Sequence, residues 1–229
     1  MKIIILAAGI GSRLGNPFPK PLTPLADGRT IMQAQLQNIE KYFDINDVTI
    51  VVGFKKELIM EQFPEAAFVY NPMFDCTNTS KSLLKALKRY RNESVLWFNG
   101  DVVFEPELLS ELLHDINQNR SFIAVNTSRV SDEEVKYTLR DGNIDALSKE
   151  VKGGLGEAVG INFISSTDIG AFITRLEACS DNDYFEKGLE MAIALDTIRI
   201  KPIDISKYDC IEVDFTEDLA NANLLFGSK

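Results

Sequence analysis

Short β-rich segments alternate with amphipathic helical segments along almost the whole chain. Residues 2–7 form a continuous β-rich run, which is typical of a central strand covered on both faces. A helical pattern follows it, and the same alternation recurs toward the end of the chain. Repeated β–α units favour a doubly wound sheet. We therefore predict a Rossmann-like α/β fold with a mixed, mostly parallel sheet and helices on both of its faces.

The expected elements follow from these periodicities. Strands are predicted over residues 2–7, 48–52, 68–70, 95–98, 122–125, 158–164, 198–203 and 210–213, with short strands around a turn between 137 and 147. Helices are predicted over 30–43, 55–63, 77–90, 106–117, 168–178, 184–195 and 216–225, the last with Thr216 as its N-cap. No biased linker or repeat divides the chain, so residues 1–229 are expected to form one domain.

The charge balance limits the partners. The chain has 24 Lys and Arg against 34 Asp and Glu, which gives a net charge of −10. Binding to nucleic acid depends on neutralising phosphates, so we expect no nucleic-acid partner. An anionic ligand would have to be held by a local cluster of cations and backbone N–H groups. The composition leaves the oligomeric state open.

Cysteine usage and hydropathy indicate the compartment. Cys76, Cys179 and Cys210 are widely spaced, and His114 is the single histidine, so a zinc site would be short of ligands. Reduced thiols are typical of a cytoplasmic protein. No apolar run approaches the ~18 residues of a membrane span. We therefore expect a cytoplasmic protein without membrane association.

The strongest motif follows the first strand. Residues 6–14 read Leu-Ala-Ala-Gly-Ile-Gly-Ser-Arg-Leu, and residues 19–22 read Pro-Lys-Pro-Leu. Glycines let backbone N–H groups approach phosphate oxygens, while Arg13 and Lys20 add positive charge. The pattern lacks the Gly-Lys-Ser/Thr of a Walker loop and the third glycine of a dinucleotide fingerprint. The joint spacing favours a phosphate cradle over a tight turn with incidental cations, and the prolines between residues 17 and 24 are expected to bar a helix.

A second motif, Asn99-Gly100-Asp101, follows the predicted strand 95–98. An Asp at the carboxyl end of a buried strand is well placed to bind Mg²⁺, which typically uses one or two carboxylates together with phosphate oxygens and water. A plain turn would use the same residues. Ligands of doubly wound sheets bind beyond the carboxyl ends of the strands, where the glycine-rich loop also lies.

The glycine-rich motif and Pro-Lys-Pro-Leu together resemble the signature of the nucleotidyltransferase (pyrophosphorylase) superfamily. The resemblance implies a GT-A-like fold, with Arg13 and Lys20 holding the triphosphate and the transferred α-phosphate. It also implies Mg²⁺ on Asp101 and, at the second metal position, on Asp214, with Glu212 as the weaker substitute. The loop is shorter than in many sugar-nucleotide members. The nucleotide-binding residues expected in the loop are Leu6, Ala7, Ala8, Gly9, Gly11 and Ser12.

Within that superfamily the chain resembles the choline-phosphate and 2-aminoethylphosphonate cytidylyltransferases. Residues 78–83, 156–161, 184–190 and the segment at Asp214 carry this resemblance. It implies that CTP is the nucleotide, with Asn78, Thr79, Ser80 and Ser82 near the base. Lys149 resembles the lysine that members place near the acceptor phosphate, although a surface lysine fits as well.

An acceptor with a cationic head group suits carboxylates and aromatic faces. Glu157, Tyr184 and Glu186 supply both. Of these, Glu157 is the preferred partner of the cation, because Tyr184 and Glu186 are better explained as a core aromatic residue and a solvated acid. We expect transfer of CMP from CTP to a small phosphorylated or phosphonate amino-alcohol-type acceptor, with release of pyrophosphate. The alternatives are a sugar-1-phosphate nucleotidyltransferase using UTP, dTTP or GTP, and a non-catalytic nucleotide-binding regulator. The set of Arg13, Lys20 and Asp101 argues against the regulator.

Overall fold

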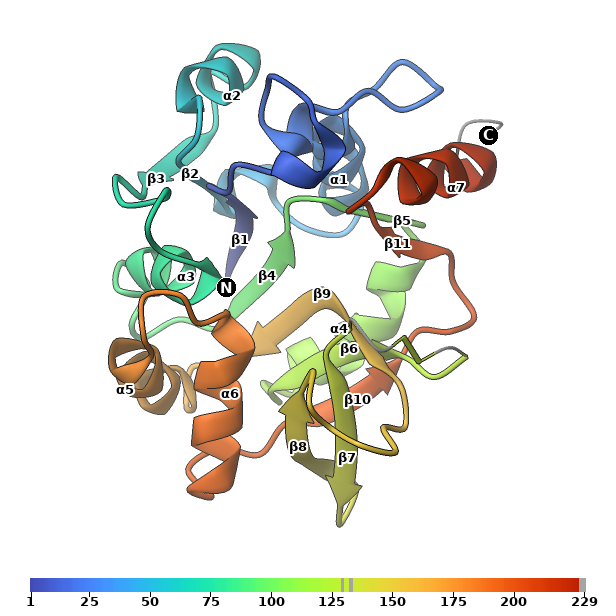
Figure 1. Ribbon diagram of the computed structural model, residues 1–229. Coiled ribbons are helices and arrows are strands. Elements are labelled where there is room, and N and C mark those ends of the chain that lie inside the picture. Colours follow the sequence, from blue (N-terminus) through green and yellow to red (C-terminus); the bar gives the residue numbers. More distant parts are fainter. Residues whose placement is uncertain (129, 132–133, 227–229) are drawn as a thin grey trace.

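A mixed β-sheet runs through the middle of the molecule in the computed structural model, which describes residues 1–128, 130–131 and 134–226 (Figure 1). The strands are β1 (Lys2–Ala7), β2 (Val48–Val52), β3 (Ala67–Tyr70), β4 (Val95–Asn99), β5 (Val102–Phe104), β6 (Phe122–Asn126), β7 (Lys136–Arg140), β8 (Asn143–Ser148), β9 (Glu157–Ile164), β10 (Lys201–Asp204) and β11 (Cys210–Glu212). The helices are α1 (Ile31–Glu40), α2 (Lys56–Gln62), α3 (Thr79–Leu87), α4 (Leu108–Asn117), α5 (Ile169–Ala178), α6 (Phe185–Ala194) and α7 (Thr216–Phe226).

The main sheet has the strand order β10-β6-β9-β4-β1-β2-β3. Strand β1 is parallel to β2 and β4, β2 is parallel to β3, and β6 is parallel to β10. Strand β9 runs antiparallel to both β4 and β6, and the hairpin of β7 and β8 is attached to it. The predicted Rossmann-like α/β fold with a mixed sheet is therefore confirmed, and β9 with its hairpin supplies the antiparallel part.

Strand β1 is covered on both faces, as its unbroken apolar sequence predicts. Ile3 and Ile5 pack into a core that includes residues of α1, α2 and α4. Ile4 and Leu6 pack into a second core with residues of α3, α5 and α6. Because successive side chains of a strand point to opposite faces, one apolar run contributes to both cores. Figure 1 shows α5 and α6 together on one side of the sheet, beside α3.

A separate ribbon of β5 and β11 supports the last helix. The two strands are antiparallel, with Val102 opposite Glu212 and Phe104 opposite Cys210. Helix α7 packs against this ribbon and against α1, and Ile31, Val103 and Phe226 are among the residues of that third core. The sequence pattern predicted β11 but missed β5, because β5 has only three residues and directly follows a turn.

Several predicted boundaries differ from the structure. Thr216 is the first residue of α7 rather than its N-cap, because the carboxylate of Asp218 accepts hydrogen bonds from the preceding N–H groups of Asp214 and Phe215. The loop after β1, whose prolines are expected to bar a helix, contains two short 3-10 helices, Ser12–Leu14 and Lys20–Leu22. Strand β10 begins at Lys201, where it first pairs with β6, instead of at residue 198.

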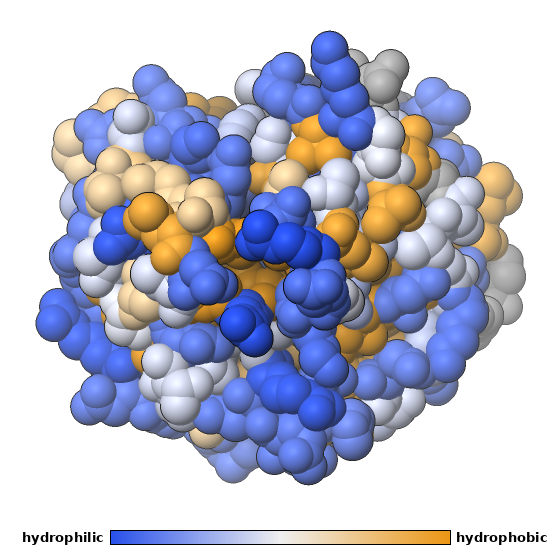
Figure 2. Space-filling view, turned by 90° about the horizontal axis from the view of Figure 1, so that it is seen from below, coloured by the Kyte–Doolittle hydropathy of each residue, from blue (hydrophilic) through white to orange (hydrophobic). Residues whose placement is uncertain are grey.

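The face of the molecule seen from below in Figure 2 carries mostly hydrophilic side chains. The face in Figure 2 is largely blue, with hydrophobic side chains gathered in separate patches. None of the helices in the described part of the chain is both long and apolar enough to cross a membrane.

Candidate active site

A cleft of about 310 Å³ opens where the carboxyl ends of β1 and β4 meet the glycine-rich loop. Its lining draws on widely separated parts of the chain: Leu6, Ala7, Gly9, Gly11, Ser12, Arg13, Lys20, Pro21, Asn78, Thr79, Asn99, Gly100, Asp101, Glu134, Val135, Lys149, Ala158, Gly160, Tyr184, Phe185, Glu186, Glu212 and Asp214. An adjoining hollow of about 550 Å³ shares Arg13, Lys149 and Asp214 with the cleft. Most residues expected to bind nucleotide, metal and acceptor therefore lie around one space.

The glycine-rich loop brings its own two ends together. Gly11 has φ +65°, and a Cβ built there would stand 2.8 Å from the Cβ of Lys20. The loop can therefore fold Lys20 against Gly11 only because residue 11 has no side chain. Ala8, which was expected to bind nucleotide, is buried, and its carbonyl accepts a hydrogen bond from the N–H of Phe54, 3.0 Å away.

Lys20 lies between two carboxylates. Its Nζ donates to Asp101 Oδ2 at 2.7 Å and also to Asp214 Oδ1, while Arg13 Nη1 donates to Asp214 Oδ2 at 2.7 Å. Burial alone would lower the pKa of Lys20, but the two carboxylates outweigh it and raise that pKa. Burial would raise the pKa of Asp214, but the hydrogen bond and charge of Lys20 and the charge of Arg13 lower it. Both groups are therefore held in their charged forms.

The ribbon of β5 and β11 explains why two carboxylates so distant in sequence meet. Asp101 immediately precedes β5, and Asp214 follows β11 by two residues. In an antiparallel pair the start of one strand lies beside the end of the other. The N–H of Val213 donates to the carbonyl of Asp101 at 3.0 Å and closes this end of the ribbon.

Two buried polar residues of α1 hold the turn that carries Asp101. Gln35 Nε2 donates to the carbonyls of Asn99 and Val102, at 2.8 Å each, and Asn38 Nδ2 donates to the carbonyl of Phe104 at 2.7 Å. Neither residue belongs to a motif that the sequence patterns single out. The signal that could have found them is a pair of amides, three residues apart, on a helix face that is otherwise apolar.

Glu212 is placed differently from Asp214. It accepts a hydrogen bond from Asn99 Nδ2 at 3.0 Å, and burial followed by the nearby charge of Asp101 raises its pKa well above the usual value. Asp214 shares the amine of Lys20 with Asp101, and Glu212 does not. This geometry favours Asp214 over Glu212 as the second carboxylate of the metal position.

The donor set fits a magnesium ion held partly by a nucleotide. Asp101 Oδ1 is buried and has no hydrogen-bond partner, so it has an unused position for a cation. The described residues include no cluster of three or more His, Cys, Asp or Glu that would enclose a metal by themselves. Mg²⁺ usually takes only one or two carboxylates and completes its shell with phosphate oxygens and water. Asp101 and Asp214 match that requirement.

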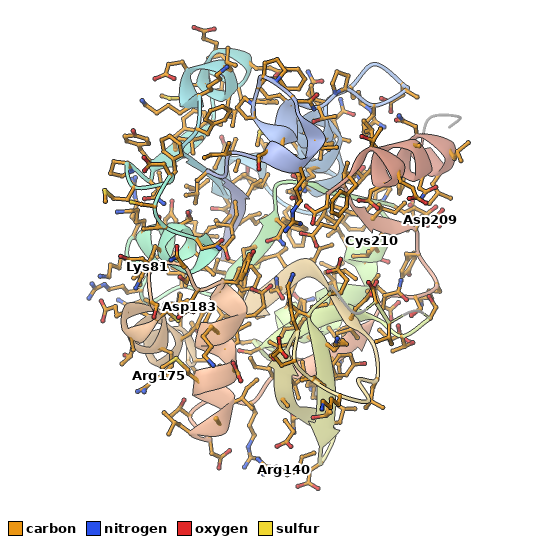
Figure 3. All side chains as sticks on the ribbon, in the orientation of Figure 1. Lys81, Arg140, Arg175, Asp183, Asp209 and Cys210 are labelled. Atoms are coloured by element: carbon orange, nitrogen blue, oxygen red, sulfur yellow. The ribbon has the colours of Figure 1, made fainter. Side chains whose placement is uncertain are left out.

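The segment at Asn78 connects the cleft to α6. Asn78 caps α3, and its side-chain amide donates to the carbonyl of Asn182 at 3.2 Å. Thr79 Oγ1 accepts a hydrogen bond from the N–H of Phe185 at 3.0 Å. Figure 3 shows the neighbouring residues Lys81 and Asp183 close together at this junction. Asn78 and Thr79 thus line the cleft and also fix the start of α6.

Two other residues expected near the base lie beneath the cleft surface. Ser80 is fully buried, and Ser82 Oγ accepts a hydrogen bond from Asn71 Nδ2 at 3.0 Å. Both are buried residues of α3, and because they are two positions apart they lie on different faces of that helix. Their position favours support of the helix over contact with a nucleotide.

The four residues expected to bind the acceptor separate into two groups. Lys149, Tyr184 and Glu186 line the cleft, and Lys149 Nζ lies over the Tyr184 ring, 5.5 Å from its centroid. Glu157 lines the adjoining hollow, where its carboxylate is buried and accepts a hydrogen bond from the N–H of Ser131 at 3.1 Å. The geometry therefore favours Glu186 over Glu157 as the carboxylate that faces an acceptor in the cleft.

Comparison with known proteins gives one family and several relatives. Residues 3–158 match the family described as the MobA-like NTP transferase domain. A CMP-5'-(3-aminopropyl)phosphonate synthase from Streptomyces rubellomurinus is 36% identical over 121 aligned residues, which cover 49% of this chain and 19% of that protein. The bifunctional protein GlmU of Methanococcus maripaludis is 33% identical over 123 residues, which cover 50% of this chain and 28% of GlmU. The chain thus matches less than a third of the length of either relative.

Among solved structures, the inositol-1-phosphate CTP transferase of T. maritima has the same fold. The TM-score is 0.79 at 18% sequence identity, and the match covers 99% of this chain and 95% of that one.

Proposed function

The chain belongs to the MobA-like NTP transferase domain family, and from this premise we propose that it transfers CMP from CTP to a small acceptor carrying a phosphate or phosphonate and an amine. One observation carries the proposal. Lys20, at the end of a glycine-rich loop, binds two carboxylates of which one also pairs with Arg13. Cations and carboxylates arranged around such a loop suit the handling of a triphosphate.

The reaction is a single displacement. An oxygen of the acceptor phosphate or phosphonate attacks the α-phosphorus of CTP and forms the new P–O bond. The bond from that phosphorus to the β-phosphoryl oxygen breaks, and pyrophosphate leaves with the electron pair. The attacking oxygen is already anionic, so no side chain must remove a proton from it. Catalysis then depends on positioning and on neutralising charge.

Each charged residue of the cleft has a part in this scheme. Arg13 and Lys20 contact the triphosphate and stabilise the charge that develops on the leaving pyrophosphate. Asp101 and Asp214 would hold Mg²⁺, which supplies further neutralisation of the phosphate oxygens. Asp218 accepts hydrogen bonds from the N–H groups of Asp214 and Phe215 and so fixes the Asp214 backbone.

The choice of CTP and of an amine-bearing acceptor rests on two supports. The relative from Streptomyces rubellomurinus is named for a CMP-aminopropylphosphonate product. In this chain Lys149 offers a cation for the acceptor's anion, and Glu186 offers a carboxylate for its amine, on the same wall of the cleft. The two charges are complementary to an acceptor that is anionic at one end and cationic at the other.

A second candidate is transfer of a nucleotide to a sugar 1-phosphate from UTP, dTTP or GTP. A solved UDP-glucose pyrophosphorylase, complexed with UDP-glucose, has the same fold with a TM-score of 0.80 at 16% sequence identity and supports this candidate. A regulator that binds nucleotides without turnover is the third reading, because a fold alone does not determine an activity.

A screen of pyrophosphate release distinguishes these functions. CTP, UTP, dTTP and GTP are each tested with 2-aminoethylphosphonate, phosphoethanolamine, phosphocholine and several sugar 1-phosphates, with Lys20→Ala as the inactive control. The proposal predicts acceptor-dependent release with CTP and the amine-bearing acceptors. Release confined to sugar 1-phosphates would establish the second candidate, and nucleotide binding without release would establish the third.

A further inference from the structure

Glu186 brings an unsatisfied carboxylate oxygen to the cleft. Its Oε2 atom is buried and has no hydrogen-bond partner. Among the described residues, Asp101 Oδ1 is the other carboxylate oxygen in this condition, and the proposed Mg²⁺ would account for it. A buried acceptor without a donor costs free energy, so such an atom calls for an explanation.

The position of Glu186 is fixed by rigid neighbours. The preceding residue, Phe185, is buried and packs edge-on against Trp97, with ring centroids 5.5 Å apart. The N–H of Phe185 also donates to Thr79 Oγ1. The first turn of α6 is therefore held by contacts with both the sheet and α3. These contacts fix the Glu186 carboxyl in the lining of the cleft.

The charged residues around Glu186 do not prevent its carboxylate from binding a cation. Burial is the main cause that raises the pKa of Glu186 to about 7, and the charge of Glu134 adds to it; a hydrogen bond from the backbone N–H of Glu186 and the charge of Lys149 act in the opposite direction. The charge of Lys149 also lowers the pKa of Asp214, so this lysine acts on the metal position and on Glu186. A ligand whose anion lies near Lys149 would carry its other end toward Glu186.

Among the described residues, the aromatic side chains that line the cleft do not form a cage for a methylated cation. Quaternary ammonium groups have no N–H donor and are recognised by several aromatic faces. Here Tyr184 is half-exposed and its ring is already faced by Lys149 Nζ, while Phe185 is buried against Trp97. A primary ammonium group has three N–H donors, as a lysine side chain does, and can satisfy Glu186 Oε2 directly.

We propose that Glu186 receives the primary ammonium group of the acceptor, so that the chain prefers phospho- or phosphono-amines with N–H donors over quaternary ammonium acceptors. The inference rests on the proposed function and narrows its substrate class. In this proposal Glu186 binds the acceptor and determines which acceptors are preferred. The reacting phosphorus and oxygen atoms are bound by other residues of the cleft.

Phosphoethanolamine and phosphocholine form a matched pair, because they differ only in the three methyl groups on nitrogen. The wild-type chain, with CTP and Mg²⁺, is assayed with both and with ethyl phosphate, which has no amine. A charge-assisted hydrogen bond corresponds to a preference of about 10-fold or more in kcat/KM. We expect that preference for phosphoethanolamine over each of the other two acceptors, expressed mainly in KM.

Two variants on the same helix complete the test. In Glu186→Gln the ratio of kcat/KM for phosphoethanolamine to that for ethyl phosphate should fall toward 1. In Glu190→Gln, whose carboxylate pairs with Lys187 at 2.8 Å, the ratio should stay as in wild type. Equal or better turnover of phosphocholine by the wild type, or an unchanged ratio in Glu186→Gln, would overturn the inference while leaving CMP transfer intact. Turnover of sugar 1-phosphates alone would overturn the proposed function, and this inference with it.

Discussion

Gly11 lies against Lys20 so closely that a Cβ on the glycine would stand 2.8 Å from the Cβ of the lysine. The atom in the way is next to the lysine backbone, so a rotation of the side chain cannot relieve the contact. Gly11 therefore determines where the Lys20 amine lies relative to Asp101 and Asp214.

The first prediction compares two glycines of this loop. Gly15 has nearly the same backbone angle, φ +67° against +65° for Gly11, but nothing lies within 4 Å of a Cβ built there. Both Gly11→Ala and Gly15→Ala should lose about 1 kcal/mol of stability because of the left-handed backbone, and Gly11→Ala should lose more, because its Cβ also clashes with Lys20. Only Gly11→Ala should also lower kcat/KM, by about tenfold or more. Equal kcat/KM values in the two variants would show that the contact between Gly11 and Lys20 has no role in catalysis.

The second prediction concerns the cations. Lys20→Ala and Arg13→Ala should each lower kcat/KM for CTP by about 10²–10³-fold, because each removes a charged contact that strengthens as pyrophosphate leaves. Lys56→Ala is the control, since Lys56 lies outside the cleft, pairs with Glu57 and covers the Tyr70 ring. Lys20→Ala should in addition lower the thermal midpoint, because it leaves Asp101 and Asp214 without their shared amine. Near-wild-type turnover in both cation variants would contradict the assignment.

The third prediction concerns the metal. A chelator should abolish turnover, and CTP with Mg²⁺ should raise the thermal midpoint of the wild type, because a ligand that binds only the native state stabilises it. Asp101→Asn keeps the shape of the side chain but loses its charge, so this stabilisation should largely disappear. Asp209→Asn, at the opposite end of the β5–β11 ribbon, is the matched control and should respond as the wild type does. An undiminished response to Mg²⁺ in Asp101→Asn would place the ion elsewhere.

Local sequence was enough to predict the strands and helices around β1 and the position of the loop. It could not show that β9 runs antiparallel between β4 and β6, because an apolar strand has the same composition in either direction. It also missed β5, and with β5 the reason why Asp101 and Asp214 meet. Contacts between distant segments leave no periodic signal.

The residues of the candidate site also fall into those that local sequence identifies and those whose surroundings depend on the fold. Arg13, Lys20 and Asp101 belong to contiguous motifs and could be selected from the sequence. The preference for Glu157 over Glu186 was a choice between two acidic residues whose surroundings depend on the fold. Glu157 accepts from the Ser131 backbone in the adjoining hollow, whereas Glu186 has a buried oxygen in the cleft. Gln35 was missed because its partners are backbone carbonyls more than sixty residues away.

The fourth prediction follows from the raised pKa of Glu186, about 7 against 4.5. A carboxyl whose folded-state pKa is raised binds its proton more tightly in the folded protein, so its favourable contribution is complete below about pH 4.5 and is lost as the pH rises through about 7. Glu186→Gln removes this titration. The thermal midpoint of Glu186→Gln relative to wild type should therefore increase between pH 4.5 and pH 8, by about 2–4 °C for each kcal/mol involved. A difference that does not change with pH would show that Glu186 titrates normally.

The proposed reaction joins CMP to the phosphorus-bearing end of an amine acceptor. The ³¹P NMR spectrum of a mixture containing the chain, CTP, Mg²⁺ and 2-aminoethylphosphonate observes this new linkage directly. We expect two mutually coupled signals from one P–O–P linkage, one from CMP and one from the phosphonate, together with an equal amount of pyrophosphate and none of these in Lys20→Ala. An unchanged phosphonate signal in the presence of active protein, with coupled signals arising only from UTP and a sugar 1-phosphate, would contradict it.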